Sequence, residues 1–278
     1  MKFGIPFGRL NPKSWLEVTL AAEELRFESV WLPEHLVLPV DMDGSPFPGE
    51  DHPPVPPNVP IYEPFTYLGF LAGQTSRVRF GTHVYNLGLR HPFVAARGVA
   101  TLDIVSGGRF EFGVGASWLG SEWVATGLDF TTRGRRLDEA LDVCRALWTD
   151  EVIEHHGEFF DFDPVMFEPK PAQQPHPPIT VGGESPAALR RAARWQGWIG
   201  MDHTPESAAK SIATIRTLRE EAGRAHEPFE ATVGGPVRSA SDVEAYAAVG
   251  VDRLIVAPWA TSREAVAQMR DFASTFIT

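Results

Sequence analysis

The chain of 278 residues contains a single cysteine, Cys144. One thiol cannot form an internal disulfide framework, and a cysteine-rich zinc site needs several, so both are excluded. No apolar run approaches the roughly 18 continuous residues of a membrane-spanning helix. The first residues, MKFGIP, enter an apolar strand-like run without the apolar core of a signal peptide. We therefore expect a cytoplasmic protein.

Positive charge is also scarce, since 25 Lys and Arg against 36 Asp and Glu leave a net charge of −11 at pH 7. Such a chain repels nucleic acids and anionic lipids at long range, which argues against both as partners. Several motifs are missing as well. The chain has no G-x-G-x-x-G after its first predicted strand, no H-E-x-x-H, no His-x-His after that strand and no G-x-S-x-G. We expect neither a metal site nor a nucleophile elbow.

What the sequence does contain is a short β-rich run followed by an amphipathic stretch of helical spacing, repeated along the chain. The predicted strands are residues 2–7, 29–33, 77–84, 109–115, 178–182, 197–201, 229–234 and 252–257. The predicted helices are residues 13–27, 64–75, 92–105, 186–195, 205–222, 241–249 and 263–276. Alternating strands and helices form a parallel sheet, and eight strands close into a barrel. We predict an α/β fold, a (β/α)8 TIM barrel, with residues 1–278 as a single domain.

Two connections exceed ordinary loop lengths, and we expect both to be insertions in the barrel. Residues 36–62, after the second strand, hold 8 of the 24 prolines. Irregular loops of this length are usually lids or binding loops. Residues 118–177, after the fourth strand, carry a predicted helix over 131–148 and a hairpin over 151–162.

Some conspicuous side chains are interpreted as structural. Cys144 falls within a predicted helix and is expected in the core. The adjacent pair His155 and His156 points in two directions in a hairpin and is expected at the surface. The spacing of Arg190, Arg191 and Arg194 along a helix predicts a solvated face.

In barrels of this kind the catalytic residues lie at the carboxyl ends of the strands. The second predicted strand ends in Glu34 and His35. An imidazole whose charge changes near neutral pH, next to a carboxylate, suits a general acid or base. In the alternative interpretation, Glu34 begins the loop and His35 hydrogen-bonds to the backbone. We favour the functional interpretation because the pair stands at a strand end.

Two other strand ends carry small residues. Gly182 and Gly183, followed by Glu184 and Ser185, join a strand to a helix. Glycines let backbone N–H groups approach a ligand and a helix N-terminus favours an anion, so this turn suits a phosphate. A turn that is merely capped by Ser185 would have the same sequence. The glycines in residues 113–115 leave room for a flat ring over the barrel, or only relieve crowding inside it.

The order of these motifs resembles that of the bacterial luciferase-like flavin superfamily. The resemblance rests on Val30-Trp31-Leu32-Pro33-Glu34-His35, Phe80-Gly81-Thr82-His83-Val84, Arg90-His91-Pro92, Gly113-Val114-Gly115 with Trp118 and Glu122, Arg133-Gly134-Arg135-Arg136 with Asp138-Glu139-Ala140, and Gly182-Gly183 followed by Ala192-Ala193 and Gly197-Trp198-Ile199. It runs from the first strand to the last and is closest to the branch that uses the deazaflavin coenzyme F420.

The resemblance implies a deazaflavin ring over the carboxyl ends of the strands. It also implies a non-proline cis peptide, or a bulge, at His83-Val84 that supports the ring. By motif position, the residues that contact the cofactor would be Glu34, His83, Val84, Asn86, Ala116, Ser117 and Ser121. The residues that hold its phosphate would be Gly182, Gly183, Glu184 and Ser185.

His35 matches the histidine that donates a proton in the sugar-phosphate dehydrogenases of this family. Those enzymes pair it with a glutamate just after the fourth strand, where this chain has Trp118. Their lysines and arginine for a substrate phosphate also lack an evident counterpart. The resemblance therefore does not imply a sugar-phosphate substrate.

The sequence thus predicts an oxidoreductase that moves a hydride between coenzyme F420 and a small organic substrate. His35 would be the proton-transfer residue, and Glu34 would orient it or contact the ring. An apolar substrate pocket would be walled by Tyr85, Trp118 and Trp259, with residues 36–62 as a lid. Two alternatives stay open: an FMN-dependent monooxygenase on the same fold, and a non-catalytic flavin-binding barrel. A homodimer is a family-level expectation.

Overall fold

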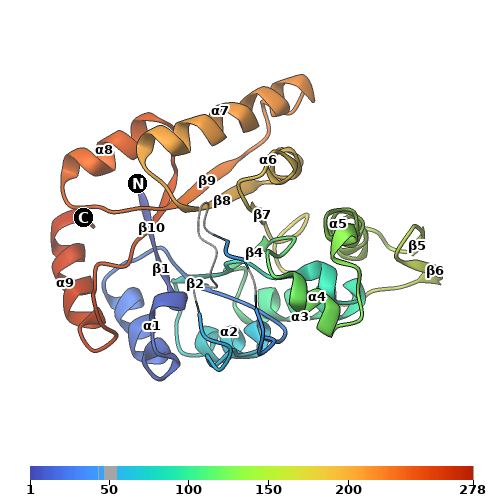
Figure 1. The fold of residues 1–278 in the computed structure, drawn as a ribbon, viewed down its shortest axis with the longest axis horizontal. Helices are drawn as coiled ribbons and strands as arrows, with labels where there is room; N and C mark the ends of the chain where they lie inside the picture. Colours follow the sequence, from blue (N-terminus) through green and yellow to red (C-terminus); the bar gives the residue numbers. More distant parts are fainter. Residues whose placement is uncertain (43, 47–54, 278) are drawn as a thin grey trace.

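Eight parallel strands form a closed barrel in the computed structural model, which describes residues 1–42, 44–46 and 55–277 (Figure 1). In order around the barrel the strands are β1, β10, β9, β8, β7, β4, β3 and β2. Their bounds are β1 (Lys2–Pro6), β2 (Ser29–Leu32), β3 (Arg79–Thr82), β4 (Phe110–Val114), β7 (Ile179–Gly182), β8 (Gly197–Asp202), β9 (Glu230–Gly234) and β10 (Arg253–Ile255). The predicted (β/α)8 barrel is confirmed, and all eight predicted strands are present.

Helices surround this barrel (Figure 1). Their bounds are α1 (Trp15–Glu24), α2 (Pro64–Ala72), α3 (Pro92–Val105), α4 (Gly120–Ala125), α5 (Arg133–Thr149), α6 (Pro186–Ala192), α7 (Pro205–Glu221), α8 (Ala240–Ala248) and α9 (Ala265–Phe276). The prolines that begin several of them occupy the first helical turn, where an N–H would have no partner. Ser185 and Thr204 cap α6 and α7 by accepting backbone hydrogen bonds. These caps fix where each helix starts after its strand.

The glycines of β4 relieve crowding inside the barrel. A Cβ atom added to Gly113 would lie 1.8 Å from the carbonyl oxygen of Thr82 on the neighbouring strand. That distance is a severe clash, so β3 and β4 approach this closely only because residue 113 has no side chain. Of the two interpretations of this run, the structure supports the one in which glycine makes room for neighbouring protein atoms.

A buried ion network fills the amino-terminal end of the barrel. Arg253 is only 1% exposed and lies 2.8 Å from Glu28, 3.1 Å from Glu111 and 2.5 Å from Glu230. Lys2 pairs with Glu230 as well. These charges close the end of the barrel at which the strands begin. The opposite end, where the strands finish, is the one that carries the residues singled out from the sequence.

The second insertion has the helix and the hairpin that were predicted for it. The helix is α5, and the hairpin consists of β5 (Ile153–His156) and β6 (Asp161–Val165), which extend beyond α5 in Figure 1. Glu139 of α5 accepts hydrogen bonds from the N–H groups of Phe159 and Phe160, and so ties the hairpin to the helix. The short helix α4 was not predicted. It begins directly after the buried Leu119.

One surface prediction is wrong and one core prediction is confirmed. Arg191 was expected on a solvated face, but it is buried and donates to both carboxylate oxygens of Asp138, at 2.6 and 2.9 Å. The reason is that α6 packs against α5, which supplies the aspartate. Cys144 lies in the core as expected. Of the predicted lid, residues 43 and 47–54 lie outside the described residues.

Candidate active site

His35 follows β2 and forms a dyad with a buried glutamate from the second insertion. Its Nδ1 atom lies 3.0 Å from Oε2 of Glu122, whose side chain is fully buried. The other carboxylate oxygen of Glu122 accepts hydrogen bonds from the N–H groups of Leu36 at 2.6 Å and Val37 at 3.3 Å. Glu122 therefore holds both the imidazole and the backbone that carries it. Because Nδ1 is bonded to a carboxylate, Nε2 is left to accept or donate a proton.

Trp118 lies next to this histidine. The two rings are 5.6 Å apart between centroids and meet edge to face at 87°. Ser117, just before it, has a φ of 67°, a left-handed conformation that residues other than glycine adopt rarely and mainly at functional sites. Ala116, Ser117 and Trp118 are half-buried at the end of β4. The structure thus places Trp118 next to His35. The sequence predicted the first as a wall of the substrate pocket and the second as the proton-transfer residue of the same site.

Glu34 does not orient His35. Its buried carboxylate lies 2.6 Å from Arg90 and accepts the backbone N–H of Asn86 at 2.8 Å. The side-chain amide of Asn86 donates back to the carbonyl oxygen of Glu34. Burial raises the pKa of Glu34, and the salt bridge to Arg90 offsets only part of that effect. The orienting role expected of Glu34 belongs to Glu122, and Glu34 instead ties the end of β2 to the segment after β3.

The peptide bond between His83 and Val84 is cis, as the family resemblance implied. Burial lowers the pKa of His83 to about 4, although the carboxylate of Asp202 acts in the opposite direction, so its imidazole is neutral at pH 7. Val84 packs over Gly182, where an added Cβ would come within 2.7 Å of the valine side chain. Val84 and Gly182 are half-buried, just beyond β3 and at the end of β7.

The turn after β7 offers several unused backbone donors. Among the described residues, the N–H groups of Gly183, Glu184, Ser185 and Ala187 have no hydrogen-bond acceptor. The hydroxyl oxygen of Ser185 accepts from the N–H of Ala188 at 3.2 Å, so its proton is free to be donated. A turn with unpaired N–H groups is a suitable seat for an anion such as a cofactor phosphate.

The carboxylate of Glu184 is already engaged within the protein. It accepts from Nε2 of His203 at 2.8 Å and from the N–H of Met201 at 3.0 Å. Burial alone would raise the pKa of Glu184, but these hydrogen bonds outweigh burial and leave the pKa below its usual range. Glu184 therefore joins the turn after β7 to the end of β8 through Oε1, while Oε2 and the backbone N–H have no partner among the described residues.

Of the three predicted pocket walls, one packs outside the barrel and one follows β10 and lies beside Arg9. Tyr85 is buried, with its ring 4.8 Å from Phe65 of α2 and 5.5 Å from Phe112, so it packs in the layer between barrel and helices. Trp259 is 9% exposed, and its indole N–H points to the carbonyl oxygen of Arg9 at 3.5 Å. Of the three aromatic residues, the structure places Trp118 next to His35.

A flavin-type cofactor fits the donors at these strand ends. The hydroxyl oxygen of Ser121 is buried and has no partner among the residues that the structure describes. Together with the free N–H groups after β7, it leaves hydrogen-bonding capacity unused beyond the adjacent strands β4 and β7. We call the carboxyl ends of the barrel strands the mouth. Buried polar groups are rarely left unpaired in native proteins.

An ion pair that was not predicted from the sequence joins two strand ends at the mouth. Arg9, after β1, lies 2.6 Å from Asp202 at the end of β8. Both side chains are more than half exposed. Arg90, which follows β3, is bonded to Glu34.

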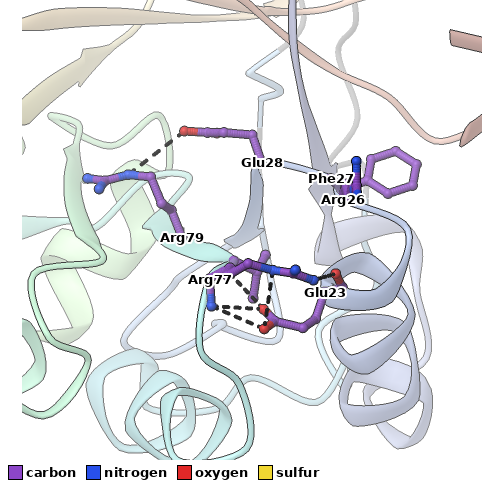
Figure 2. Close-up of a pocket in the computed structure, with 7 residues that line it drawn as sticks. Glu23, Arg26, Phe27, Glu28, Arg77 and Arg79 are labelled. Carbon is purple, nitrogen blue, oxygen red and sulfur yellow. Dashed lines mark hydrogen bonds and ion pairs between the residues drawn. The ribbon is translucent and has the colours of Figure 1, made fainter. Parts of the chain in front are cut away.

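A cavity of about 420 Å³ lies at the other end of the barrel, by the starts of β2 and β3 (Figure 2). Glu23 there accepts hydrogen bonds from the backbone N–H groups of residues 76–78. Burial alone would raise its pKa, but these bonds lower it to about 2. Figure 2 also shows Glu28 paired with Arg79. Because both carboxylates are occupied, this cavity offers no free acid or base.

Within the described ranges, no group of three or more His, Cys, Asp or Glu side chains is arranged to hold a metal ion. In the same part of the chain, no helix is both long enough and apolar enough to cross a membrane.

Sequence reasoning missed Glu122 as the partner of His35 and His203 as the partner of Glu184. One signal was available for Glu122: it is an acid in the largely apolar segment 118–125, and an acid on a buried helix face needs a partner. No comparable signal marks His203, because its partner comes from a neighbouring strand end rather than from nearby sequence.

Sequence comparison finds relatives in mycobacteria. An uncharacterized protein of Mycobacterium tuberculosis is 33% identical over 231 residues, which are 83% of this chain and 79% of that protein. The phthiodiolone/phenolphthiodiolone dimycocerosates ketoreductase of Mycobacterium bovis is 32% identical over 212 residues, which are 73% of this chain and 55% of the ketoreductase.

Solved structures share the fold over most of their length. The monooxygenase RslO1 of Streptomyces bottropensis superposes with a TM-score of 0.78 at 23% identity, over 100% of this chain and 99% of that one. An F420-dependent secondary alcohol dehydrogenase with an F420-acetone adduct gives 0.79 at 17% identity, over 99% and 98%. The FMN-bound oxygenating constituent of 3,6-diketocamphane monooxygenase of Pseudomonas putida gives 0.68 at 19% identity, over 86% and 68%.

The family model described as luciferase-like monooxygenase matches residues 7–275. That match spans the barrel from the end of β1 to α9 and includes the His35–Glu122 dyad and the turn after β7. The chain belongs to the luciferase-like monooxygenase family.

Proposed function

We propose that this protein is an oxidoreductase that transfers a hydride between coenzyme F420 and a small organic carbonyl or alcohol at the mouth of the barrel. The observation that carries the proposal is the dyad formed by His35 and Glu122, held at a strand end beside Trp118. Support comes from two similar proteins, one a ketoreductase by name and one an F420-dependent secondary alcohol dehydrogenase.

The dyad supplies the proton that such a reaction requires. Reduction of a carbonyl group adds a hydride to carbon and a proton to oxygen, and oxidation of the alcohol removes both. Coenzyme F420, when bound, supplies or accepts the hydride. His35 donates the proton from Nε2 in reduction and takes it back in oxidation, while its Nδ1 atom stays bonded to Glu122. Glu122 holds the ring through Nδ1, so the proton is exchanged at Nε2.

The cofactor is held mainly by backbone groups. The free N–H groups of Gly183, Glu184, Ser185 and Ala187 take the phosphate, together with the hydroxyl of Ser185. Val84 presents an apolar surface to the ring, and Ser121 supplies a hydrogen-bonding hydroxyl. The carboxylate of Glu34 is paired with Arg90, whereas Glu184 keeps Oε2 without a hydrogen bond among the described residues, next to the phosphate-binding turn.

An uncharged substrate suits this mouth. Arg9 is paired with Asp202, and Arg90 with Glu34. Neither cation is therefore placed to receive a substrate phosphate. The aromatic wall formed by Trp118 favours an apolar body next to the reacting carbon. These features fit a ketone or a secondary alcohol better than a sugar phosphate.

The first test is a fluorescence titration of the purified protein with coenzyme F420 and, in parallel, with FMN. We expect micromolar binding of F420 and much weaker binding of FMN. A Gly183→Ala variant should weaken F420 binding, because the added methyl would sit at a φ of 114° and 3.0 Å from Ala188. Binding of neither cofactor would refute the proposal.

Preference for FMN would favour a different function, a monooxygenase that uses reduced flavin and oxygen. The family description and the FMN-bound neighbour give this second candidate its support. The two are separated by assaying reduced F420 with a panel of ketones under argon, and reduced FMN with an oxygen electrode. Turnover under argon supports the hydride transfer that we propose, whereas oxygen consumption with FMN would replace it.

A further inference from the structure

A second cavity, of about 150 Å³, lies where α5 meets the starts of β7 and β8. It is far from the mouth, because it is formed by residues that precede these two strands. Three guanidinium groups contribute to its wall: Arg145 from α5, Arg194 just after α6 and Arg224 after α7. The cations therefore converge from one helix and two loops, in a chain whose net charge is −11.

One carboxylate lines the same cavity. Asp142 lies 3.1 Å from Arg194 and 3.8 Å from Arg145. Two further acids pair with these arginines without lining the cavity: Glu227 with Arg224 at 2.6 Å, and Asp138 with Arg194 at 3.7 Å. The cavity lining itself thus carries three positive charges and one negative charge. Arg145 has the weakest pairing of the three cations and keeps most of its donors free.

Trp195, which lines this cavity, carries a buried donor that lacks an acceptor among the described residues. The indole N–H of Trp195 is buried and has no hydrogen-bond partner among the described residues, and the side chain is only 4% exposed. Native proteins rarely leave such a group unpaired. Gln196, beside it, accepts the N–H of Ile179 with its side-chain oxygen, so its amide NH₂ remains available as a donor. The cavity therefore presents donors in excess of acceptors.

His176 adds one acceptor of a particular kind. Its Nδ1 atom donates to the carbonyl oxygen of Pro177 at 2.8 Å, so Nε2 carries a lone pair in the neutral ring. Burial lowers the pKa of His176, although the hydrogen bond to Pro177 acts in the opposite direction, and the charge of Arg145 lowers it further. A neutral Nε2 next to guanidinium groups can accept the proton of a monohydrogen anion.

We propose that this cavity binds a tetrahedral oxyanion of the phosphate class. Guanidinium forks and an indole N–H match the acceptor oxygens, and the neutral imidazole matches a protonated one. A cavity of about 150 Å³ suits an inorganic ion or the end group of a phosphomonoester. A bound anion would tie α5, in the second insertion, to α6 and α7 of the barrel. The proposal does not depend on the redox function.

The test uses the indole region of a ¹H–¹⁵N spectrum of the full chain, in which the eight tryptophans give up to eight signals. The signal of Trp195 is assigned by its loss in Trp195→Phe. Inorganic phosphate, sulfate and glycerol 2-phosphate are each titrated against sodium chloride at constant ionic strength. We expect phosphate to move the Trp195 signal in a saturable way and to raise the melting temperature. A shift with glycerol 2-phosphate but not with phosphate would identify the monoester as the ligand class.

Two variants make the assignment specific. Arg145→Gln removes the least engaged cation and should weaken phosphate binding about tenfold, the scale of one hydrogen bond to a charged group. Arg190→Gln removes an equal charge from the exposed face of α6, outside the cavity, and should leave binding unchanged. Circular dichroism confirms that both variants are folded.

Three results would overturn the proposal. One is a Trp195 signal that follows ionic strength and not the identity of the anion. Another is phosphate binding of equal strength in Arg145→Gln and in the parent chain, which would place the anion elsewhere, such as at the turn after β7. The third is equal weakening by Arg190→Gln, which would reveal a general charge effect rather than a site.

Discussion

The Nδ1 atom of His35 lies 3.0 Å from Oε2 of Glu122, although 87 residues separate the two along the chain. The neighbour in sequence, Glu34, is bonded to Arg90 instead. His35, the residue that we propose transfers the proton, therefore depends on the second insertion for its orientation, because Glu122 belongs to α4. The barrel strand positions the histidine, and the insertion fixes its tautomer.

Replacing His35 by alanine tests the proton-transfer role directly. Because a positioned acid or base contributes typically about 10²–10⁴-fold to a rate, we expect kcat to fall by about that factor. Cofactor affinity should change little, since His35 is not among the groups that hold the phosphate. Steady-state kinetics together with an F420 titration measure both quantities. Full turnover in this variant would remove His35 from the mechanism.

Glu122→Gln tests the positioning role of the carboxylate. The amide keeps the shape but replaces one acceptor oxygen by an NH₂ group, so either the imidazole or the backbone N–H groups of Leu36 and Val37 lose their partner. The ring is then held less firmly, and we expect kcat to fall about 10- to 100-fold. KM should change less than kcat. Glu17→Gln, on the exposed face of α1, is the matched control. An unchanged kcat would show that Glu122 does not position His35.

Arg90→Gln should destabilise the protein. It leaves the carboxylate of Glu34 buried without a cation, and breaking a buried pair in this way costs about 3–5 kcal/mol. The pKa of Glu34 is already raised in the folded state, so the folded chain takes up a proton as the pH falls. The free energy of unfolding that Arg90→Gln removes should therefore be smaller at pH 5 than at pH 8. Urea unfolding at the two pH values measures it, and Glu34→Gln in the same chain should restore part of the loss.

His83 should make the protein less stable in mild acid. Its pKa is lowered from 6.5 to about 4 by burial, so the unfolded chain binds a proton in this range that the folded chain does not. The contribution of the neutral His83 side chain to the free energy of unfolding is fully present above pH 6.5 and is lost as the pH falls toward 4. In His83→Gln the free energy of unfolding should depend less steeply on pH in that window. His226→Gln, an exposed histidine, should leave the slope unchanged, and equal slopes in all three chains would contradict the prediction.

Arg253 should be essential to the amino-terminal end of the barrel. Arg253→Gln leaves Glu28, Glu111 and Glu230 without their shared cation, and we expect a loss of at least about 3 kcal/mol or failure to fold. Arg270→Gln breaks only an exposed pair with Glu24 and should cost less than about 1 kcal/mol. The melting temperatures of the two variants, measured by thermal unfolding, are compared with that of the parent chain. Similar melting temperatures would show that the buried network contributes little.

The barrel could be predicted because its signals are local. Each strand is a short apolar run, and prolines such as Pro92 and Pro186 mark where helices begin. These features depend on backbone geometry within a few residues, so the eight strands and most helices were found. The helix α4 was not, since its six residues are too few for a periodic pattern.

The candidate site was predictable in position but not in pairing. That His35 stands at a strand end follows from the strand pattern, and the small residues after β7 marked that turn. The partners did not follow, because Glu122, Arg90 and His203 reach the site from other elements. The placement of Tyr85 failed for a related reason. The residues beyond a strand no longer follow its alternation, so which side of the barrel they face is decided by packing.

By itself, the sequence determined the barrel, its two long insertions and the end of the barrel at which the chemistry is expected, since these depend on the periodicity of apolar residues and on local capping. Tertiary structure alone decided which acid holds His35 and that the carboxylates of Glu34 and Glu184 are engaged within the protein. It also decided that three arginines, one from α5 and two from the segments after α6 and α7, line one cavity. The reason is physical: a hydrogen bond or an ion pair depends on distances of about 3 Å in space, and a closed barrel sets those distances between residues that are far apart along the chain.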